Sequence, residues 1–176
     1  MPVIKTTPGA LLTAAKNIMV SGLNISPSLV KISSRKELPY FTGDQDFVLR
    51  LRLPIPEDGF VAGSGKYASV LRKVLTITIR TRLATDRSDS DERLLLDPTY
   101  GHLIREDQIL RLFHLRILND ANSNTLAIEP IRVTSATGDP DELPSYGKVK
   151  EEVSQKQFCF SNMNFEILYI MDVPNV

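Results

Sequence analysis

The feature that most constrains the fold is a strict alternation of side-chain character over residues 74–83. One side of the two-residue period is mostly apolar and consists of Leu75, Ile77, Ile79 and Leu83, with Thr81 among them. The other side carries hydroxyl and guanidinium groups, on Thr76, Thr78, Arg80 and Arg82. This period is typical of a β-strand with one buried face, and the arginines of the second face require solvent, a carboxylate or another chain. We therefore expect the function to lie on that second face.

A second stretch, residues 46–53, shows the same alternation. Its apolar side consists of Phe47, Leu49, Leu51 and Leu53, and its other side includes Asp46, Arg50 and Arg52. Antiparallel pairing of the two strands would bring Arg50 and Arg52 close to Arg80 and Arg82 on one basic face. Like charges side by side destabilise an isolated sheet, and an acidic surface of a neighbouring molecule would relieve the repulsion. The alternative is a solvated face with splayed arginines, where ion pairs contribute little.

Two helices are predicted from apolar residues at helical spacing. The first follows Thr7 and Pro8, which suit a helix start, and Gly22 is expected to end it. Its apolar face consists of Leu11, Ala14, Ala15, Ile18 and Met19. The second lies within residues 101–118, with an apolar face of Ile109, Leu112, Phe113 and Ile117, and with Arg105, Arg111 and Arg116 able to reach solvent. Both helices are expected to cover the same face of the sheet.

Further strands are predicted from shorter alternating stretches. They are residues 28–33, residues 126–133 at an edge or with a bulge at Pro130, and residues 157–173 with a bend near Asn162. Pro54, Pro56 and Gly59 are expected to stop the second strand, and residues 59–65 to form a loop or hairpin tip. Residues 135–157 lack a hydrophobic pattern, which makes this connection the best candidate for an arm that reaches a neighbour.

Length and charge limit the class of protein. The 176 residues suit one domain, residues 1–176, and 21 Lys and Arg against 21 Asp and Glu leave no excess positive charge to hold the phosphates of nucleic acid. We expect neither a membrane span nor a secretory signal, because no apolar run is long enough and the amino-terminal residues lack the pattern. The single cysteine, Cys159, lies in an alternating stretch and favours a buried thiol in a reducing compartment.

Neither a cofactor site nor a metal site is predicted. Residues 63–66 read Gly-Ser-Gly-Lys, but a phosphate-binding loop would need a glycine in place of Phe60 and a serine or threonine in place of Tyr67. His102 and His114 lie about three helical turns apart, which is too far for them to share one metal ion.

No catalytic residues are predicted either. Glu106 and Asp107 are adjacent and point to different sides of a helix, so they do not form a facing carboxylate pair. No local signature marks Cys159 as a nucleophile.

The order of the elements and four stretches of sequence resemble the tail terminator (tail completion) proteins of tailed bacteriophages. The stretches are residues 47–53 (Phe-Val-Leu-Arg-Leu-Arg-Leu), residues 74–86, Tyr100-Gly101-His102 before a helix, and residues 126–133 (Leu-Ala-Ile-Glu-Pro-Ile-Arg-Val). The resemblance implies an α+β fold in which a mostly antiparallel sheet carries two helices on one face, with long loops or arms. It is a likeness of pattern and order, because the family has no catalytic signature.

The resemblance also implies a structural role in the virion. Such proteins form a ring, usually a homohexamer, that caps the finished tail tube, ends its polymerisation and offers a surface for joining to the head. The implied partners are other copies of the chain, the tail tube protein, a neck or connector protein and the tail sheath, and genomic DNA passes through the lumen without specific binding. Assembly takes place in the host cytoplasm.

The residues themselves suggest how copies of the chain meet. The basic side chains Arg50, Arg52, Arg80 and Arg82 lie on strands, whereas Asp86, Asp89, Asp91 and Glu92 lie in an acidic loop. Contact between the two regions of neighbouring subunits would close a ring. A net charge of zero also suits a lumen through which DNA slides.

Two alternatives stay open. One is another ring protein of the phage neck, a head-completion or connector subunit, which would also be a small interaction protein. The other is a small hydrolase whose site is assembled from residues distant in sequence, and a cleft that gathers His102 or His114 with several acids would favour it.

Overall fold

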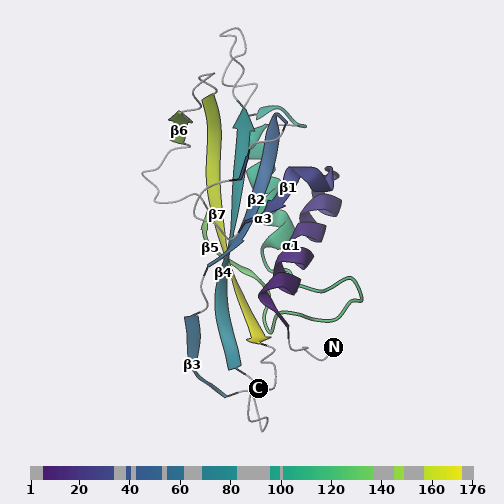
Figure 1. The fold of residues 1–176 in the computed structure, drawn as a ribbon, viewed down its shortest axis with the longest axis vertical. Coiled ribbons are helices and arrows are strands. Elements are labelled where there is room, and N and C mark those ends of the chain that lie inside the picture. Colours follow the sequence, from purple (N-terminus) through teal and green to yellow (C-terminus); the bar gives the residue numbers. More distant parts are fainter. Residues whose placement is uncertain are drawn as a thin grey trace.

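The computed structural model describes residues 6–33, 39–40, 43–52, 55–61, 69–82, 96–99, 101–136, 145–148 and 157–171 (Figure 1). The helices are α1 (Pro8–Leu23), the short 3-10 helix η1 (Pro27–Leu29) and α3 (His102–Phe113). The strands are β1 (Val30–Ile32), β2 (Gln45–Leu51), β3 (Ile55–Val61), β4 (Ser69–Arg82), β5 (Arg132–Ala136), β6 (Ser145–Lys148) and β7 (Gln157–Met171).

The two longest strands, β4 and β7, form the centre of the sheet. They pair antiparallel without a break, from Ser69 opposite Met171 to Arg82 opposite Phe158. The order along the sheet is β1-β2-β4-β7-β5, and in addition β3 pairs with β4 and β6 with β7. The β1–β2 pair is parallel and the other pairs are antiparallel. The protein therefore has an α+β fold with a mostly antiparallel sheet, as the sequence predicted.

Both helices cover one face of this sheet, which we call the first face (Figure 1). Helix α1 packs on β1 and β2, α3 packs on β4, β5 and β7, and the two helices contact each other. The apolar sides of the strands point toward them and are completely or almost completely buried: Phe47, Leu49, Leu75, Ile77, Ile79, Met163, Phe165, Ile167 and Tyr169. Burial of each large apolar side chain contributes about 1.5–3 kcal/mol, so this layer is the main source of stability.

Helix α1 starts as predicted and ends differently. The Thr7 hydroxyl accepts a hydrogen bond from the Ala10 amide at 3.2 Å, and Pro8 occupies the first turn. The helix ends at Asn24, whose φ of 50° is left-handed, and not at Gly22. Gly22 instead allows close helix packing, because a Cβ there would lie only 2.4 Å from Leu112 Cδ2 of α3. The expected helix end at Gly22 was wrong because this glycine is used for packing.

The second alternating stretch ends before its prolines, and a separate strand follows it. Strand β2 ends at Leu51 and β3 begins at Ile55, and both pair with the same strand, Leu51 opposite Leu75 and Ile55 opposite Arg72. The predicted end of the second strand before Pro54 is confirmed, whereas Pro56 and Gly59 lie inside the next strand, β3. An edge strand tolerates proline because its outer side needs no donor. The loop predicted for residues 59–65 begins later than expected, because residues 59–61 belong to β3 and Val61 pairs with Ser69. Residues 62–68 lie outside the described part.

The segment after α3 also differs from its prediction. The helix ends at Phe113, and Leu115 takes a left-handed φ of 60°. Ile117, expected on the buried helical face, is consequently 48% exposed. The predicted strand 126–133 is shorter and later, because β5 spans Arg132–Ala136. It pairs only with β7 among the described strands, and its irregularity lies between Val133 and Ser135 rather than at Pro130.

The long connection 135–157 contains ordered pairing. Strand β6 lies within it and pairs with the first part of β7, Ser145 opposite Phe160 and Lys148 opposite Gln157. Residues 137–144 and 149–156 of the proposed arm lie outside the described residues. The bend expected near Asn162 is absent from β7, because the register with β4 runs through this position. Polar partners on both faces, described below, accommodate Ser161 and Asn162 in a straight strand.

Candidate functional site

The second face of the sheet, opposite the helices, carries polar side chains from β2, β4 and β7. The register brings Asp46 opposite Arg80, Val48 opposite Thr78, and Arg50 opposite Thr76. On the other side of β4, Thr78 faces Asn162 and Thr76 faces Asn164. The sequence correctly predicted that Arg50 and Arg80 share one face.

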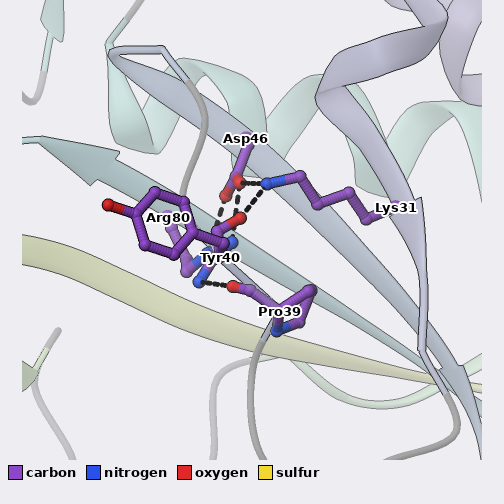
Figure 2. Close-up of polar contacts among 5 residues, drawn as sticks. All are labelled: Lys31, Pro39, Tyr40, Asp46 and Arg80. Atoms are coloured by element: carbon purple, nitrogen blue, oxygen red, sulfur yellow. Dashed lines mark hydrogen bonds and ion pairs between the residues drawn. The ribbon is translucent and has the colours of Figure 1, made fainter.

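An ion cluster lies at one end of this face (Figure 2). Arg80 binds Asp46 through two hydrogen bonds, Nε to Oδ1 and Nη2 to Oδ2, each of 2.6 Å. Lys31 of β1 donates to Asp46 Oδ2 at 2.8 Å. The Asp46 side chain is 0% exposed and the Arg80 side chain 9%. A single buried carboxylate therefore neutralises part of the charge of two cations.

The same two cations hold a backbone segment over the face. Arg80 Nη1 donates to the carbonyl oxygen of Pro39 at 2.8 Å, and Lys31 Nζ donates to that of Tyr40 (Figure 2). The Tyr40 residue is 79% exposed. Of the partners expected for Arg80, the carboxylate is present within the molecule as Asp46, and the Pro39 carbonyl is a further acceptor. A subunit contact through Arg80 stays a prediction.

Two threonine–asparagine pairs occupy the middle of the second face. Thr78 Oγ1 donates to Asn162 Oδ1 at 2.7 Å, and Thr76 Oγ1 donates to Asn164 Oδ1 at 2.8 Å. Because each amide oxygen is held by a hydroxyl, the amide NH₂ groups point away from the threonines. These pairs explain why Thr76 and Thr78 are buried although they lie on the polar side of β4.

Arg50 lies next to these pairs and has no counter-ion. Its Nε and Nη2 atoms are buried and make no hydrogen bond. Burial lowers the pKa of Arg50, and the charge of nearby Arg80 lowers it further. Unsatisfied buried donors of this kind cost about 1–3 kcal/mol each, or more when charged. Arg50 is therefore the least satisfied charged group on the described part of the second face.

The remaining predicted interface residues differ in their surroundings, and some lie outside the described residues. Arg52 is exposed just beyond the end of β2, where its amide bonds to Val74. The Arg82 side chain is 37% exposed and lies 3.6 Å from Asp44 Oδ1, in a loose ion pair. The acidic residues Asp86, Asp89, Asp91 and Glu92 lie outside the described residues, so their position relative to the arginines remains a prediction.

A scan against protein-family models gave no match, and a search of curated proteins found no similar sequence. Within the described residues, no three His, Cys, Asp or Glu side chains are close enough together to hold a metal ion. No helix in that part of the chain is long and apolar enough to cross a membrane.

A second polar cluster, which the sequence did not predict, lies on the first face beneath α3. Gln45 Nε2 donates to Thr81 Oγ1 at 2.9 Å, and Thr81 Oγ1 lies 2.8 Å from His102 Nδ1. His102 Nε2 lies 3.0 Å from Ser161 Oγ, and Glu106 accepts a side-chain hydrogen bond from Ser161. The cluster members are far apart in sequence, which is why no local motif marks them. The sequence signal that could have indicated this cluster was the presence of a histidine and a serine at buried positions of amphipathic elements.

His102 lies between two hydroxyl groups, those of Thr81 and Ser161. Because a hydroxyl can both donate and accept, the tautomer of His102 sets the direction of the two hydrogen bonds. His102 is also 0% exposed and Ser161 5%. The arrangement joins α3 to β4 and β7.

Burial sets the protonation of this cluster. The pKa of His102 is lowered to about 4, because burial disfavours the imidazolium. The pKa of Glu106 is raised by burial, and the hydrogen bond from Ser161 opposes that change. Arg105, expected to reach solvent, is buried and donates from Nε to Gln45 Oε1 at 3.2 Å. That expectation was wrong, since Gln45 and Gln108 bind its guanidinium.

Proposed function

We propose that the protein is a ring-forming structural subunit that resembles phage tail terminators and caps a tail tube. The observation that carries this proposal is the two-faced sheet. Both helices cover the first face, and the second face displays Arg50 and Arg52, which have no acidic partner among the described residues. Tyr40, held through its carbonyl oxygen by Lys31, has 79% of its surface exposed. Tyrosine and arginine are the residue types that most often anchor protein interfaces.

The proposed role follows from the order of elements and the stretches 47–53 and 74–86, which resemble tail terminators. In this role, copies of the chain form a closed ring, with a homohexamer as the proposed state. One side of the ring binds the last layer of tail tube protein and stops its growth, and the other side receives the neck protein. The proposed location is the tail and neck region of the virion, after assembly in the host cytoplasm.

The internal ion cluster changes which residues can serve the ring. Arg80 is already bound by Asp46 and the Pro39 carbonyl, so reversing its charge would disturb the subunit itself. Arg50 and Arg52 remain the candidates for contact with another molecule, and Arg82 is secondary because it already lies near Asp44.

The test is a tube-growth assay with the purified protein and the tail tube protein encoded near it. We expect the protein to bind one end of the tube and to stop elongation, which electron microscopy of tube lengths would measure. A protein that leaves tube length unchanged and binds the portal side of the neck would instead be a connector subunit. Binding to neither would refute a role in the tail.

A further inference from the structure

A groove lies on the helix side of the molecule, between α1 and the turn of residues 116–121 that follows α3. Its apolar lining comes from Ala14 and Ile18 of the helix and from Ile117 and Ala121 of the turn. Its volume is about 210 Å³. Sites for small molecules usually enclose about 300–1,000 Å³, so this groove suits one large side chain better than a cofactor.

The turn that forms one wall of the groove is held in place by hydrogen bonds. The Ile131 amide donates to the Arg116 carbonyl at 2.9 Å. The Asp120 carboxylate, which also lines the groove, accepts from the amides of Asn122 and Asn124 at 2.8 Å each. The other wall is a regular helix. A groove that is formed before binding loses little conformational entropy when a partner enters it.

The groove also offers polar groups at its open side. Asn17, Arg116 and Asn119 line it and are exposed. Arg116 makes no ion pair with any other residue that the structure describes. Its guanidinium is therefore available to a carboxylate or to the face of an aromatic ring. Apolar walls with amides and one cation at the rim fit a side chain that is apolar along its length and polar at its tip.

Tyr40 has these properties. With 79% of its surface exposed, it is the most exposed large hydrophobic residue in the described part of the chain. Lys31 binds its carbonyl oxygen, and Arg80 binds that of Pro39 at 2.8 Å, whereas the phenol hydroxyl takes no part in the contacts drawn in Figure 2. Tyrosine combines an apolar ring with a hydroxyl that can donate and accept. The backbone of Tyr40 is thus fixed while its ring is free to contact another molecule.

Asp44 adds a negative charge close to Tyr40. It lies two residues before Asp46, and Lys31 joins Asp46 to the Tyr40 carbonyl. The Asp44 side chain is 92% exposed and only loosely paired, 3.6 Å from Arg82. An exposed carboxylate beside the protruding tyrosine is complementary to the exposed Arg116 at the rim of the groove.

We propose that Tyr40 of one copy of the chain inserts into the groove of a second copy, and that Asp44 then faces Arg116. The inference rests on the proposed ring and names the contact that joins its subunits. Tyr40 lies over the second face of the sheet, whereas the groove lies on the helix side. The contact therefore joins two different surfaces, and a heterologous contact of this kind closes a ring when its rotation allows.

The first experiment measures native mass by analytical ultracentrifugation over a range of protein concentrations. Tyr40→Ala is expected to weaken self-association by about 30-fold, as for the central anchor of an interface. Asn17→Trp, which fills the groove, should have a similar effect. Leu103→Ala removes an exposed apolar side chain elsewhere, and Thr13→Trp adds an indole to α1 outside the groove. Both controls should assemble like the wild type.

The second experiment mixes the two defective variants. Tyr40→Ala keeps an intact groove, and Asn17→Trp keeps Tyr40, so one contact can form between them and no further copy can be added. The mixture should therefore give a species of two chains and nothing larger, although each variant alone is a folded monomer by circular dichroism. The chain with both substitutions has neither half of the contact and should stay monomeric in either mixture.

Three results would overturn the inference: a wild-type protein that stays a monomer at every concentration, a Tyr40→Ala variant that assembles like the wild type, or a mixture of the two variants that remains monomeric. The tube-growth assay is scored separately. Wild-type protein that ends tubes while its assembly is indifferent to Tyr40 keeps the proposed function and removes this contact. Assembly that depends on Tyr40 without any effect on tubes keeps the contact and removes the tail role.

Discussion

Asp46 has a role in the fold that the charge pattern of its strand did not predict. From the sequence it was one of three charged residues on the polar side of a strand, beside Arg50 and Arg52. In the fold it lies directly opposite Arg80 and is completely buried. The alternation correctly assigned these residues to a face, because that assignment is local. The choice of partner depends on strand register between residues 34 positions apart, which no local pattern specifies.

Replacing Asp46 with asparagine should destabilise the protein strongly. Arg80 would keep its burial and lose its counter-ion, and Lys31 would lose the same partner. Removing one member of a buried ion pair typically costs about 3–5 kcal/mol. Chemical denaturation should therefore show a loss of roughly 3 kcal/mol in the free energy of unfolding. The matched control is Asp107→Asn, because Asp107 pairs with Arg111 on the surface and should contribute less than about 1 kcal/mol.

His102 makes stability depend on pH. Its folded pKa of about 4 lies below the value of about 6.5 in an unfolded chain, so the unfolded state binds more protons in between. The contribution of the neutral histidine is complete above about pH 6.5 and is lost as the pH falls toward 4. The size expected from this shift is on the order of 3 kcal/mol.

The measurement is the free energy of unfolding from pH 7 to pH 4 for wild type and for His102→Gln. The variant is needed because Glu106, which contacts the cluster and has a raised pKa, changes stability in the opposite direction. The difference between wild type and His102→Gln should move against the wild type as the pH falls. A constant difference across this range would contradict a buried neutral imidazole.

At the scale of the elements, the contact between α1 and α3 shows which features of the helices depend on local sequence and which depend on another element. The start of α1 and its buried face were predicted because Thr7, Pro8 and the helical spacing act within the helix. The packing role of Gly22 was not predicted, because it depends on the contact with Leu112 of α3. The end of α3 was placed too late for the same kind of reason: Ile117 continues the helical spacing, and the chain leaves the helix to pair near Ile131.

Substitution of Gly22 by alanine should therefore destabilise the protein despite the higher helix propensity of alanine. The new Cβ would lie 2.4 Å from Leu112 Cδ2, so Leu112 or the helix must shift. Overpacking costs about 1–3 kcal/mol, against about 1 kcal/mol gained in propensity. Thermal unfolding should show a net loss for Gly22→Ala. The control Gly9→Ala, whose Cβ would find only Thr7 Oγ1 at 3.8 Å, should be neutral or stabilising, and equal behaviour of the two variants would contradict the close packing.

At the scale of the whole molecule, the sheet is organised around two strands that are far apart in the sequence, β4 in the middle of the chain and β7 near its carboxyl end. β4 and β7 pair over their full length, and β2, β3, β5 and β6 are added to their edges. The sequence predicted both strands because their alternation is strong. It could not predict that they are neighbours, since such long-range pairing is determined by the packing of the whole chain. The polar cluster of Thr81, His102 and Ser161 was missed for this reason, because it forms only when β4, β7 and α3 meet.

This arrangement predicts an uneven resistance to hydrogen exchange. The amides of β4 and β7 lie at the centre of the sheet, above a buried apolar layer, and should exchange only by global unfolding. β1 has three residues and pairs only with β2 among the described strands, so it should open locally and exchange earlier. Exchange followed by mass spectrometry under native conditions should give the slowest rates around Ile77 and Phe165 and faster rates at residues 30–32. Equal protection of the β1 and β4 amides would contradict this prediction. It would mean that the ion pair between Lys31 and Asp46 stabilises β1 more strongly than an edge position implies.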